Sequence, residues 1–227
     1  MKNVLNFLFP RYCWICGKRL QIGEKHLCVQ CLLNLPLTHY HSQLSNPMEQ
    51  LFWGLIPIER ANAFFFYEKE GRVSQILYHI KYYNHPEVGE YIAETMSVEQ
   101  LSFFKDIDYV IAVPINKIRK RKRGYNQSDY LARGISKATG IPVLEKVLSR
   151  VVSTDTQTRK NRQERAENVF SAFTLHPSFS IDQLRNKHVL LVDDVCTTGA
   201  TLKAAAEPLC KVPGIRISIL SMAVVKI

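Results

Sequence analysis

Uninterrupted apolar runs mark the strands of this chain. Residues 109–113 (YVIAV) and 189–192 (VLLV) are apolar throughout, which is typical of strands buried on both faces of a parallel sheet. Three other short runs, rich in aromatic or β-branched residues, are further strand candidates: 63–67, 147–152 and 215–220.

Apolar residues at helical spacing fill the gaps between these runs. Val73, Ile76, Leu77 and Ile80 recur at intervals of three and four residues, which places them on one face of a helix. Similar spacing predicts further helices over 88–96, 130–138 and about 199–209. Because strands alternate with helices, the sequence predicts an α/β fold with a parallel sheet flanked by helices.

Length and composition predict a small second structural unit and an anionic binding partner. The 227 residues are about one and a half times a typical domain of ~150 residues. With 46% hydrophobic and 22% charged residues, the composition is that of a globular protein and excludes collagen-like and disordered chains. The net charge of +10 suits phosphate groups, nucleic acid or an acidic membrane surface.

The chain contains no apolar run near the ~18 residues that a transmembrane helix needs. The opening run, Val4 to Phe9, is interrupted by Asn6, followed by Pro10, and lacks a small-residue cleavage site. We therefore expect no signal peptide. Together with the uneven distribution of the cysteines, this predicts a cytoplasmic protein.

Four cysteines near the start predict a zinc knuckle. Cys13, Cys16, Cys28 and Cys31 form two C-x-x-C pairs separated by eleven residues, a spacing that can present four thiolates to structural Zn²⁺. Redox thiols or idle buried cysteines are the alternatives. We divide the chain into a zinc knuckle (1–36), a polar linker (37–62) and an α/β domain (63–227).

The segment after the 189–192 strand carries the strongest chemical signal. Asp193 and Asp194 stand at its carboxyl end, where open α/β sheets bind ligands. A turn rich in Thr and Gly follows and leads into a helix, which suits a phosphate group. The alternative is that the acid pair only caps a turn. The segment is not a Walker A loop, because no G-x-x-x-x-G-K-S/T is present.

This segment resembles the phosphoribosyl pyrophosphate loop of the type I phosphoribosyltransferases, in which an apolar strand, two acidic residues and a Thr/Gly-rich turn follow one another. The resemblance implies that Asp193 and Asp194 face the ribose hydroxyls as the catalytic pair. It implies that the turn holds the 5-phosphate through Thr197, Thr198, Gly199, Ala200 and Thr201. Mg²⁺, bound together with phosphoribosyl pyrophosphate, is the cofactor that it implies.

A strongly basic segment follows the 109–113 strand, and we expect it to be a loop. Six of the seven residues from 117 to 123 are basic, and such a block repels itself unless anions neutralise it. In type I phosphoribosyltransferases the corresponding loop binds pyrophosphate, which implies ligand-binding roles for Asn116, Lys117, Arg119 and Arg123. The alternatives are a nucleic-acid patch, with Tyr125 stacked on a base, and a solvated loop.

Three weaker candidates complete the set. The polar segment 157–168 lies where the family has its flexible catalytic loop, which implies a mobile lid with Gln157, Arg165 and Asn168; an exposed helix is the alternative. Lys81, followed by Tyr82, is a further basic contact candidate. Cys196 and Cys210 are expected to be small core fillers.

Taken together, the four-cysteine head, the run from Arg123 to Gln127, the 157–168 segment and the loop from Asp193 to Thr201 resemble the ComF family. This family includes competence proteins and GntX-type DNA utilisation proteins, and the resemblance covers nearly the whole chain. It implies a phosphoribosyltransferase-like domain that acts in natural competence or in the use of DNA as a nutrient. The implied partners are phosphoribosyl pyrophosphate, single-stranded DNA and the competence machinery, including a ComFA-like helicase.

Three functions compete at this point. The first is a competence factor that retains the phosphoribosyl pyrophosphate site and works with the DNA import machinery. The second is a nucleobase-salvage phosphoribosyltransferase that releases pyrophosphate, and the third is a regulator that binds the ligand without turnover. No residue set in the sequence specifies an acceptor, so the first function is favoured on the resemblance, and turnover is left open.

Overall fold

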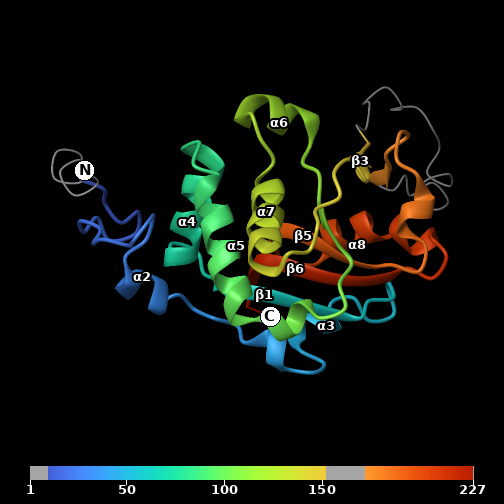
Figure 1. The fold of residues 1–227 in the computed structure, drawn as a ribbon, viewed down its shortest axis with the longest axis horizontal. Coiled ribbons are helices and arrows are strands. Elements are labelled where there is room, and N and C mark those ends of the chain that lie inside the picture. The colour runs from blue at the N-terminus through green and yellow to red at the C-terminus, as the bar shows by residue number, and fades with distance from the viewer. Residues whose placement is uncertain (1–9, 152–171, 227) are drawn as a thin grey trace, which may run out of the picture.

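A parallel sheet of four strands forms the centre of the computed structural model, which describes residues 10–151 and 172–226 (Figure 1). The strand order is β1-β6-β5-β2, and every neighbouring pair is parallel. The strands are Arg60–Tyr67 (β1), Tyr109–Ala112 (β2), His188–Cys196 (β5) and Arg216–Val225 (β6). The predicted parallel sheet flanked by helices is therefore confirmed.

Strand β5 lies inside the sheet because its side chains pack on both faces. Leu190 and Val192 belong to one core cluster, and Val189 and Leu191 belong to the other. All four are at most 1% exposed. The strand extends four residues beyond this apolar run, so the two aspartates lie within β5 rather than after it.

Three helices cover one face of the sheet: α4 (Arg72–Tyr82), α5 (Glu87–Glu99) and α7 (Gln127–Thr139). The first two follow the predicted spacing, and α7 ends at Gly140, as expected. Helices α5 and α7 pack closely at Gly134, where a Cβ atom would lie 2.2 Å from the Glu90 carbonyl oxygen. Lys137 and Glu90 form an ion pair across the same contact.

The opposite face is covered by α3 (Pro47–Gln50), α8 (Ala200–Ala206) and the 3₁₀ helix η4 (Leu209–Lys211). Helix α8 is shorter than predicted because Pro208, which has no backbone N–H to donate, interrupts it before η4. Further 3₁₀ helices span Tyr40–Ser42 (η1), Leu101–Phe104 (η2) and Ile181–Leu184 (η3).

The strand predicted at 147–152 forms, but outside the main sheet. It is β3 (Leu148–Arg150), which pairs antiparallel with β4 (Phe173–Leu175) in a separate two-stranded sheet. Strand β4 has too few residues to show a period of its own. Phe173 is nevertheless buried and joins the core cluster behind α8.

The cysteine-rich head packs against the body of the protein. It contains α2 (Val29–Leu33), and its Trp14 ring lies 4.9 Å from the His79 ring of α4 and 4.0 Å from the ring of His85. Within the segment 37–62, the Met48 and Phe52 side chains are fully buried in the core. The division of the chain into knuckle, linker and domain stays a prediction.

Within residues 10–151 and 172–226, none of the helices is both long and apolar enough to cross a membrane.

Candidate functional site

Two buried carboxylates lie near the carboxyl end of β5. Asp193 and Asp194 are each only 8% exposed. The Ser128 hydroxyl donates a hydrogen bond to Asp193 Oδ1 over 3.1 Å, and the backbone N–H of Asp194 donates to the same oxygen over 2.8 Å. The first turn of α7, which supplies Ser128, therefore holds the first carboxylate in place.

The second carboxylate binds side chains from two helices. Gln127 Nε2 of α7 donates to Asp194 Oδ2 over 2.8 Å. The ammonium group of Lys81, in the last turn of α4, lies 2.7 Å from the same oxygen. Sequence reasoning gave Lys81 only a weak contact role and gave Gln127 none, because both partners are distant from Asp194 in the sequence.

Burial and charge repulsion both act on the acid pair. Burial, followed by the neighbouring Asp194 charge, raises the pKa of Asp193 to about 7, although the hydrogen bonds from the Asp194 N–H and Ser128 oppose the increase. The folded protein therefore ionises Asp193 only at a free-energy cost. A cation or hydroxyl donors placed above the pair would relieve that cost.

The turn after β5 presents hydroxyl groups beside the acid pair. Thr197 and Thr201 line the adjoining cleft, and the backbone of Gly199 adopts φ +75°, in the left-handed region that favours glycine. A Cβ atom on Gly199 would lie 3.1 Å from the Phe52 ring, so this ring supports the turn from below. Thr198 and Ala200 are exposed on the same turn.

The basic segment is a helix, and its prediction as a loop is wrong. Helix α6 spans Lys117–Arg123; Asn116 caps its N-terminus by accepting a hydrogen bond from the Ile118 N–H over 2.8 Å. Gly124 ends it with φ +86°. Lys and Arg are good helix formers, and cations favour the last turn of a helix, so a segment without an apolar face can still be helical.

A cleft of about 1180 Å³ joins these parts. The acid pair lies in it, with α4 contributing one wall and α6 another. Among the predicted ligand-binding residues, Arg119, Arg123, Thr197 and Thr201 line the cleft. Asn116 is the N-cap of α6, and Lys117 is exposed. The cleft lining does not include Lys117, Thr198, Gly199 or Ala200. Arg121, Lys122 and Arg150 line the cleft although no role was predicted for them individually.

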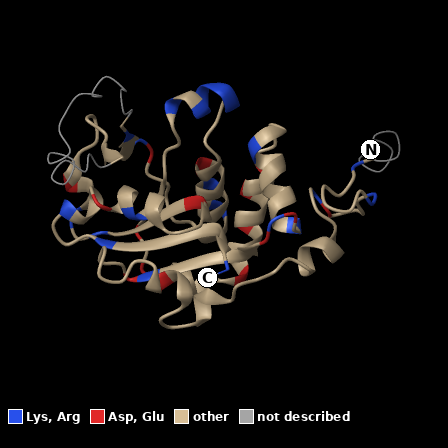
Figure 2. Ribbon diagram, turned by 180° about the vertical axis from the view of Figure 1, so that it is seen from behind, with Lys and Arg blue, Asp and Glu red and all other residues tan. Residues whose placement is uncertain are grey.

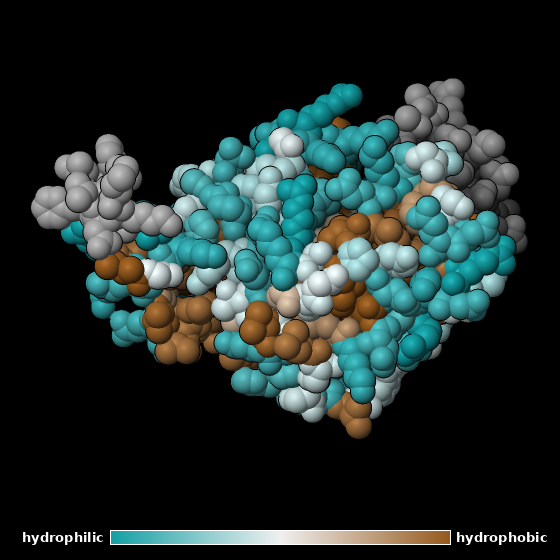
Figure 3. Space-filling view, viewed as in Figure 1, coloured by the Kyte–Doolittle hydropathy of each residue, from teal (hydrophilic) through white to brown (hydrophobic). Residues whose placement is uncertain are grey.

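Positive charge is concentrated at the mouth of this cleft. Figure 2 shows the Lys and Arg residues gathered on α6, at the end of the molecule where α4 also rises. The surface there is hydrophilic (Figure 3). A cleft with acidic groups inside and cations around it suits a ligand that carries both hydroxyls and phosphates.

Two other predictions meet the structure differently. The ring of Tyr125 is half-buried beside the Tyr130 ring, and its hydroxyl donates to the Ile80 carbonyl oxygen, so it is not free to stack on a base. The lid candidates Gln157, Arg165 and Asn168 lie outside the described residues.

Cys196 and Cys210 are the cysteines outside the head. The side chain of Cys196, the last residue of β5, is buried in the core, and burial raises its pKa to about 12. A thiol that stays protonated is a poor nucleophile. Cys210 is partly buried, and burial also raises its pKa.

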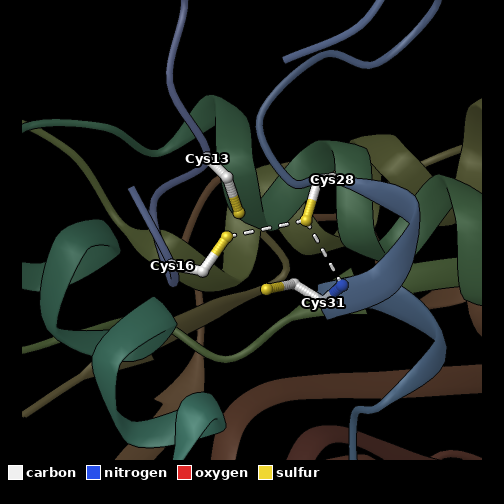
Figure 4. A group of neighbouring side chains, drawn as sticks. All are labelled: Cys13, Cys16, Cys28 and Cys31. Carbon is white, nitrogen blue, oxygen red and sulfur yellow. Dashed lines mark hydrogen bonds between the residues drawn. The ribbon is translucent and has the colours of Figure 1, made fainter. Parts of the chain in front are cut away.

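The four head cysteines converge on one point (Figure 4). The sulfur atoms of Cys13, Cys16, Cys28 and Cys31 all lie within 4.8 Å of one another, and those of Cys16 and Cys28 are 3.7 Å apart. Burial raises the pKa of Cys28 and Cys31, whereas backbone hydrogen bonds from Cys16 and Cys28 outweigh burial at Cys13 and lower its pKa to about 7. Such a group could hold a metal ion, because four adjacent thiolates need a cation between them.

Comparisons with known proteins show which sequences this chain resembles. The family model described as phosphoribosyl transferase domain matches residues 101–221. Competence protein F of Haemophilus influenzae is 31% identical over 210 residues, which cover 89% of this chain and 80% of that protein. DNA utilization protein YhgH of Escherichia coli O157:H7 is 26% identical over 221 residues, with coverage of 89% and 92%.

Among solved structures, the allosteric regulatory enzyme of purine biosynthesis matches with a TM-score of 0.41 and 20% identity. That match covers 59% of this chain and 25% of the enzyme.

Proposed function

Since the chain belongs to the ComF family of proteins with a phosphoribosyl transferase domain, we propose that it binds phosphoribosyl pyrophosphate and acts in the uptake and use of DNA. The relatives named competence protein F and DNA utilization protein support the biological part. The observation that supports phosphoribosyl pyrophosphate as the ligand is the buried acid pair in a cleft bordered by cations.

The chemistry of the cleft matches the parts of this ligand. Asp193 and Asp194 accept hydrogen bonds from the ribose hydroxyls in addition to those from Ser128, Gln127 and Lys81, because each carboxylate has about four acceptor sites. The hydroxyls of Thr197 and Thr201 bind the 5-phosphate. The cations of α6, including Arg119 and Arg123, neutralise the pyrophosphate. Each group of the ligand thereby meets a complementary side chain of the cleft.

Mg²⁺ fits the same cleft as a partner of the ligand. Carboxylate, hydroxyl and phosphate oxygens are the ligands that Mg²⁺ prefers, and Asp193 and Asp194 supply the carboxylates here. When bound, the ion neutralises the pyrophosphate and offsets the repulsion that raises the pKa of Asp193. Lys81 neutralises Asp194 from the protein side.

Zn²⁺ is the metal that we propose for the head. Cys13, Cys16, Cys28 and Cys31 would supply four sulfur ligands and leave no position for a substrate, so this ion would be structural rather than catalytic. It keeps Trp14 packed against α4 and thereby ties the head to the helix that carries Lys81. We place the protein in the cytoplasm, where single-stranded DNA and a ComFA-like helicase of the competence machinery are its partners.

Calorimetric titration of phosphoribosyl pyrophosphate with Mg²⁺ into the zinc-loaded protein tests this function. The matched control carries Asp193→Asn and Asp194→Asn, which keep the size of both side chains but remove their charge. We expect binding by the wild type and none by the control, with circular dichroism showing that the control is folded. Equal affinity of the two proteins would refute the proposed site.

Release of pyrophosphate with a free nucleobase would identify the second candidate, a salvage transferase, which the intact acid pair also favours. Ligand binding without release agrees with a competence factor or a regulator. Deletion of the gene separates these two, because only the competence factor predicts a defect in transformation or in growth on DNA.

A further inference from the structure

Two exposed tyrosines of α4 stand on the wall of the cleft. Tyr78 and Tyr82 are one helical turn apart, and their ring centroids are separated by 4.9 Å. Tyr78 is 52% exposed and Tyr82 is 68% exposed. Lys81, on the same cleft-facing side of α4, reaches Asp194, so the two rings lie on the helix face that leads down to the acid pair.

Cations border these rings. The guanidinium group of Arg123, from α6, lies over the Tyr82 ring at 5.9 Å from its centroid. Arg119, Arg121 and Lys122 line the same cleft. Aromatic faces interleaved with cations are the surface on which proteins hold single-stranded nucleic acid, because a base stacks on the ring while a cation meets its phosphate.

The Tyr78 and Tyr82 rings are not buried against the rest of the protein, so core packing does not account for their presence on the cleft wall. Tyr125, which also lines the cleft, is half-buried, and its hydroxyl donates to the Ile80 carbonyl oxygen of α4. Tyr78 and Tyr82, by contrast, leave a large part of their apolar surface in water, which forgoes the free energy that burial of an aromatic ring supplies. A flat apolar ligand that enters the cleft would recover it.

We propose that Tyr78 and Tyr82 form a stacking platform for an unpaired nucleobase, with the Arg123 guanidinium group over the Tyr82 ring. The inference rests on the proposed function, because it places the base next to the phosphoribosyl pyrophosphate site. The platform offers ring faces rather than hydrogen-bonding edges. The nearby Ser74 hydroxyl already donates to the Gly71 carbonyl oxygen over 2.7 Å. Every base has an aromatic face, so the platform tolerates all four bases.

The base has two sources that share this chemistry, a free nucleobase and a nucleotide within a single strand. The experiment uses a short labelled oligothymidylate and a matched strand of abasic sites, measured by fluorescence anisotropy, together with free thymine and adenine, measured by saturation-transfer magnetic resonance. The variants are the alanine pair (Tyr78→Ala with Tyr82→Ala), the phenylalanine pair (Tyr78→Phe with Tyr82→Phe), and the control Tyr12→Ala, which changes an exposed tyrosine of the head.

We expect the alanine pair to bind the base-containing strand about 5- to 150-fold more weakly than the wild type, the loss typical of one stacked base. The phenylalanine pair and Tyr12→Ala should bind as the wild type does, and no variant should change the affinity for the abasic strand. A free base that gives a signal only when the two rings are present identifies the source as a free base. A ring-dependent effect confined to the strand identifies a nucleotide.

Two results would overturn the platform. One is an alanine pair that binds the base-containing strand and the free bases as tightly as the wild type. The other is an equal loss of affinity for the base-containing and abasic strands, which would indicate a phosphate site instead. Calorimetry with phosphoribosyl pyrophosphate separates this proposal from the preceding one, because the alanine pair should retain that binding, whereas the Asp193/Asp194 variant should lose it.

Discussion

The Lys81 ammonium group lies 2.7 Å from Asp194 Oδ2, although the two residues are 113 positions apart in the sequence. The pair joins the last turn of α4 to the central strand β5. Its side chains are only 23% and 12% exposed, so water screens the attraction weakly. Lys81 is therefore the internal counter-ion of the acid pair.

Replacement of Lys81 by methionine should lower the free energy of unfolding by about 1–3 kcal/mol at pH 8, because it leaves a buried carboxylate without its counter-ion. Urea denaturation measures the change. The matched control is Lys187→Met, which breaks the more exposed Lys187–Asp108 pair and should cost no more than about 1 kcal/mol. Equal losses in the two variants would show that Lys81 has no special role.

Asp193→Asn should stabilise the ligand-free protein, and more so at higher pH. The folded-state pKa of this carboxyl, about 7, lies above its usual 3.8, so its stabilising contribution is present below pH 4 and is lost as the pH rises through 7. The uncharged amide avoids that loss. Thermal unfolding at pH 5 and pH 8, without ligand, should show the larger gain at pH 8, of the order of 1–3 kcal/mol. A gain that does not depend on pH would contradict the raised pKa.

Gly134→Ala should destabilise the protein by about 1–3 kcal/mol, because the added Cβ would lie 2.2 Å from the Glu90 carbonyl oxygen and must push α5 away from α7. Gly89→Ala is a suitable control in α5. Its Cβ would lie 3.3 Å from the flexible end of Ile80, and alanine favours a helix. Chemical denaturation should give a much lower free energy of unfolding for Gly134→Ala than for Gly89→Ala. The reverse order would rule out the close helix contact.

Removal of the metal should loosen the head. In a Trp53→Phe background, Trp14 is the remaining tryptophan, and its ring packs against His79 and His85. A zinc chelator should shift its emission to longer wavelength and lower the melting temperature, since metal binding supplies folding free energy. Cys16→Ser should reproduce both effects, whereas Cys210→Ser should retain zinc and the native emission. An unchanged spectrum on chelation would argue against a structural ion.

The sequence is informative where a feature depends on neighbouring residues. The four-residue apolar run 189–192 predicted an internal strand, and the acid pair followed from its position directly after that run. Sequence spacing also brought the four cysteines together correctly. In each case the contact partners are close in the sequence or share a simple period.

Features that depend on distant contacts were missed. Nothing around Lys81 indicates that its side chain turns towards Asp194, because that contact depends on how α4 lies on the sheet. Helix α6 was missed because none of its residues is buried, so no apolar period marks it and only its two caps do. Strand β4 has three residues and a partner in a separate sheet, which leaves no alternation to detect.

The Phe52 ring beneath Gly199 limits how far the chain can be shortened. A fragment that starts at residue 63, at the predicted domain boundary, would omit Phe52 and Met48, both fully buried in the core behind the turn that follows β5. The turn would then rest on an open hollow. A fragment that keeps Phe52 beside Gly199 must therefore begin before α3, which makes the segment between head and sheet part of the folded unit that supports this turn.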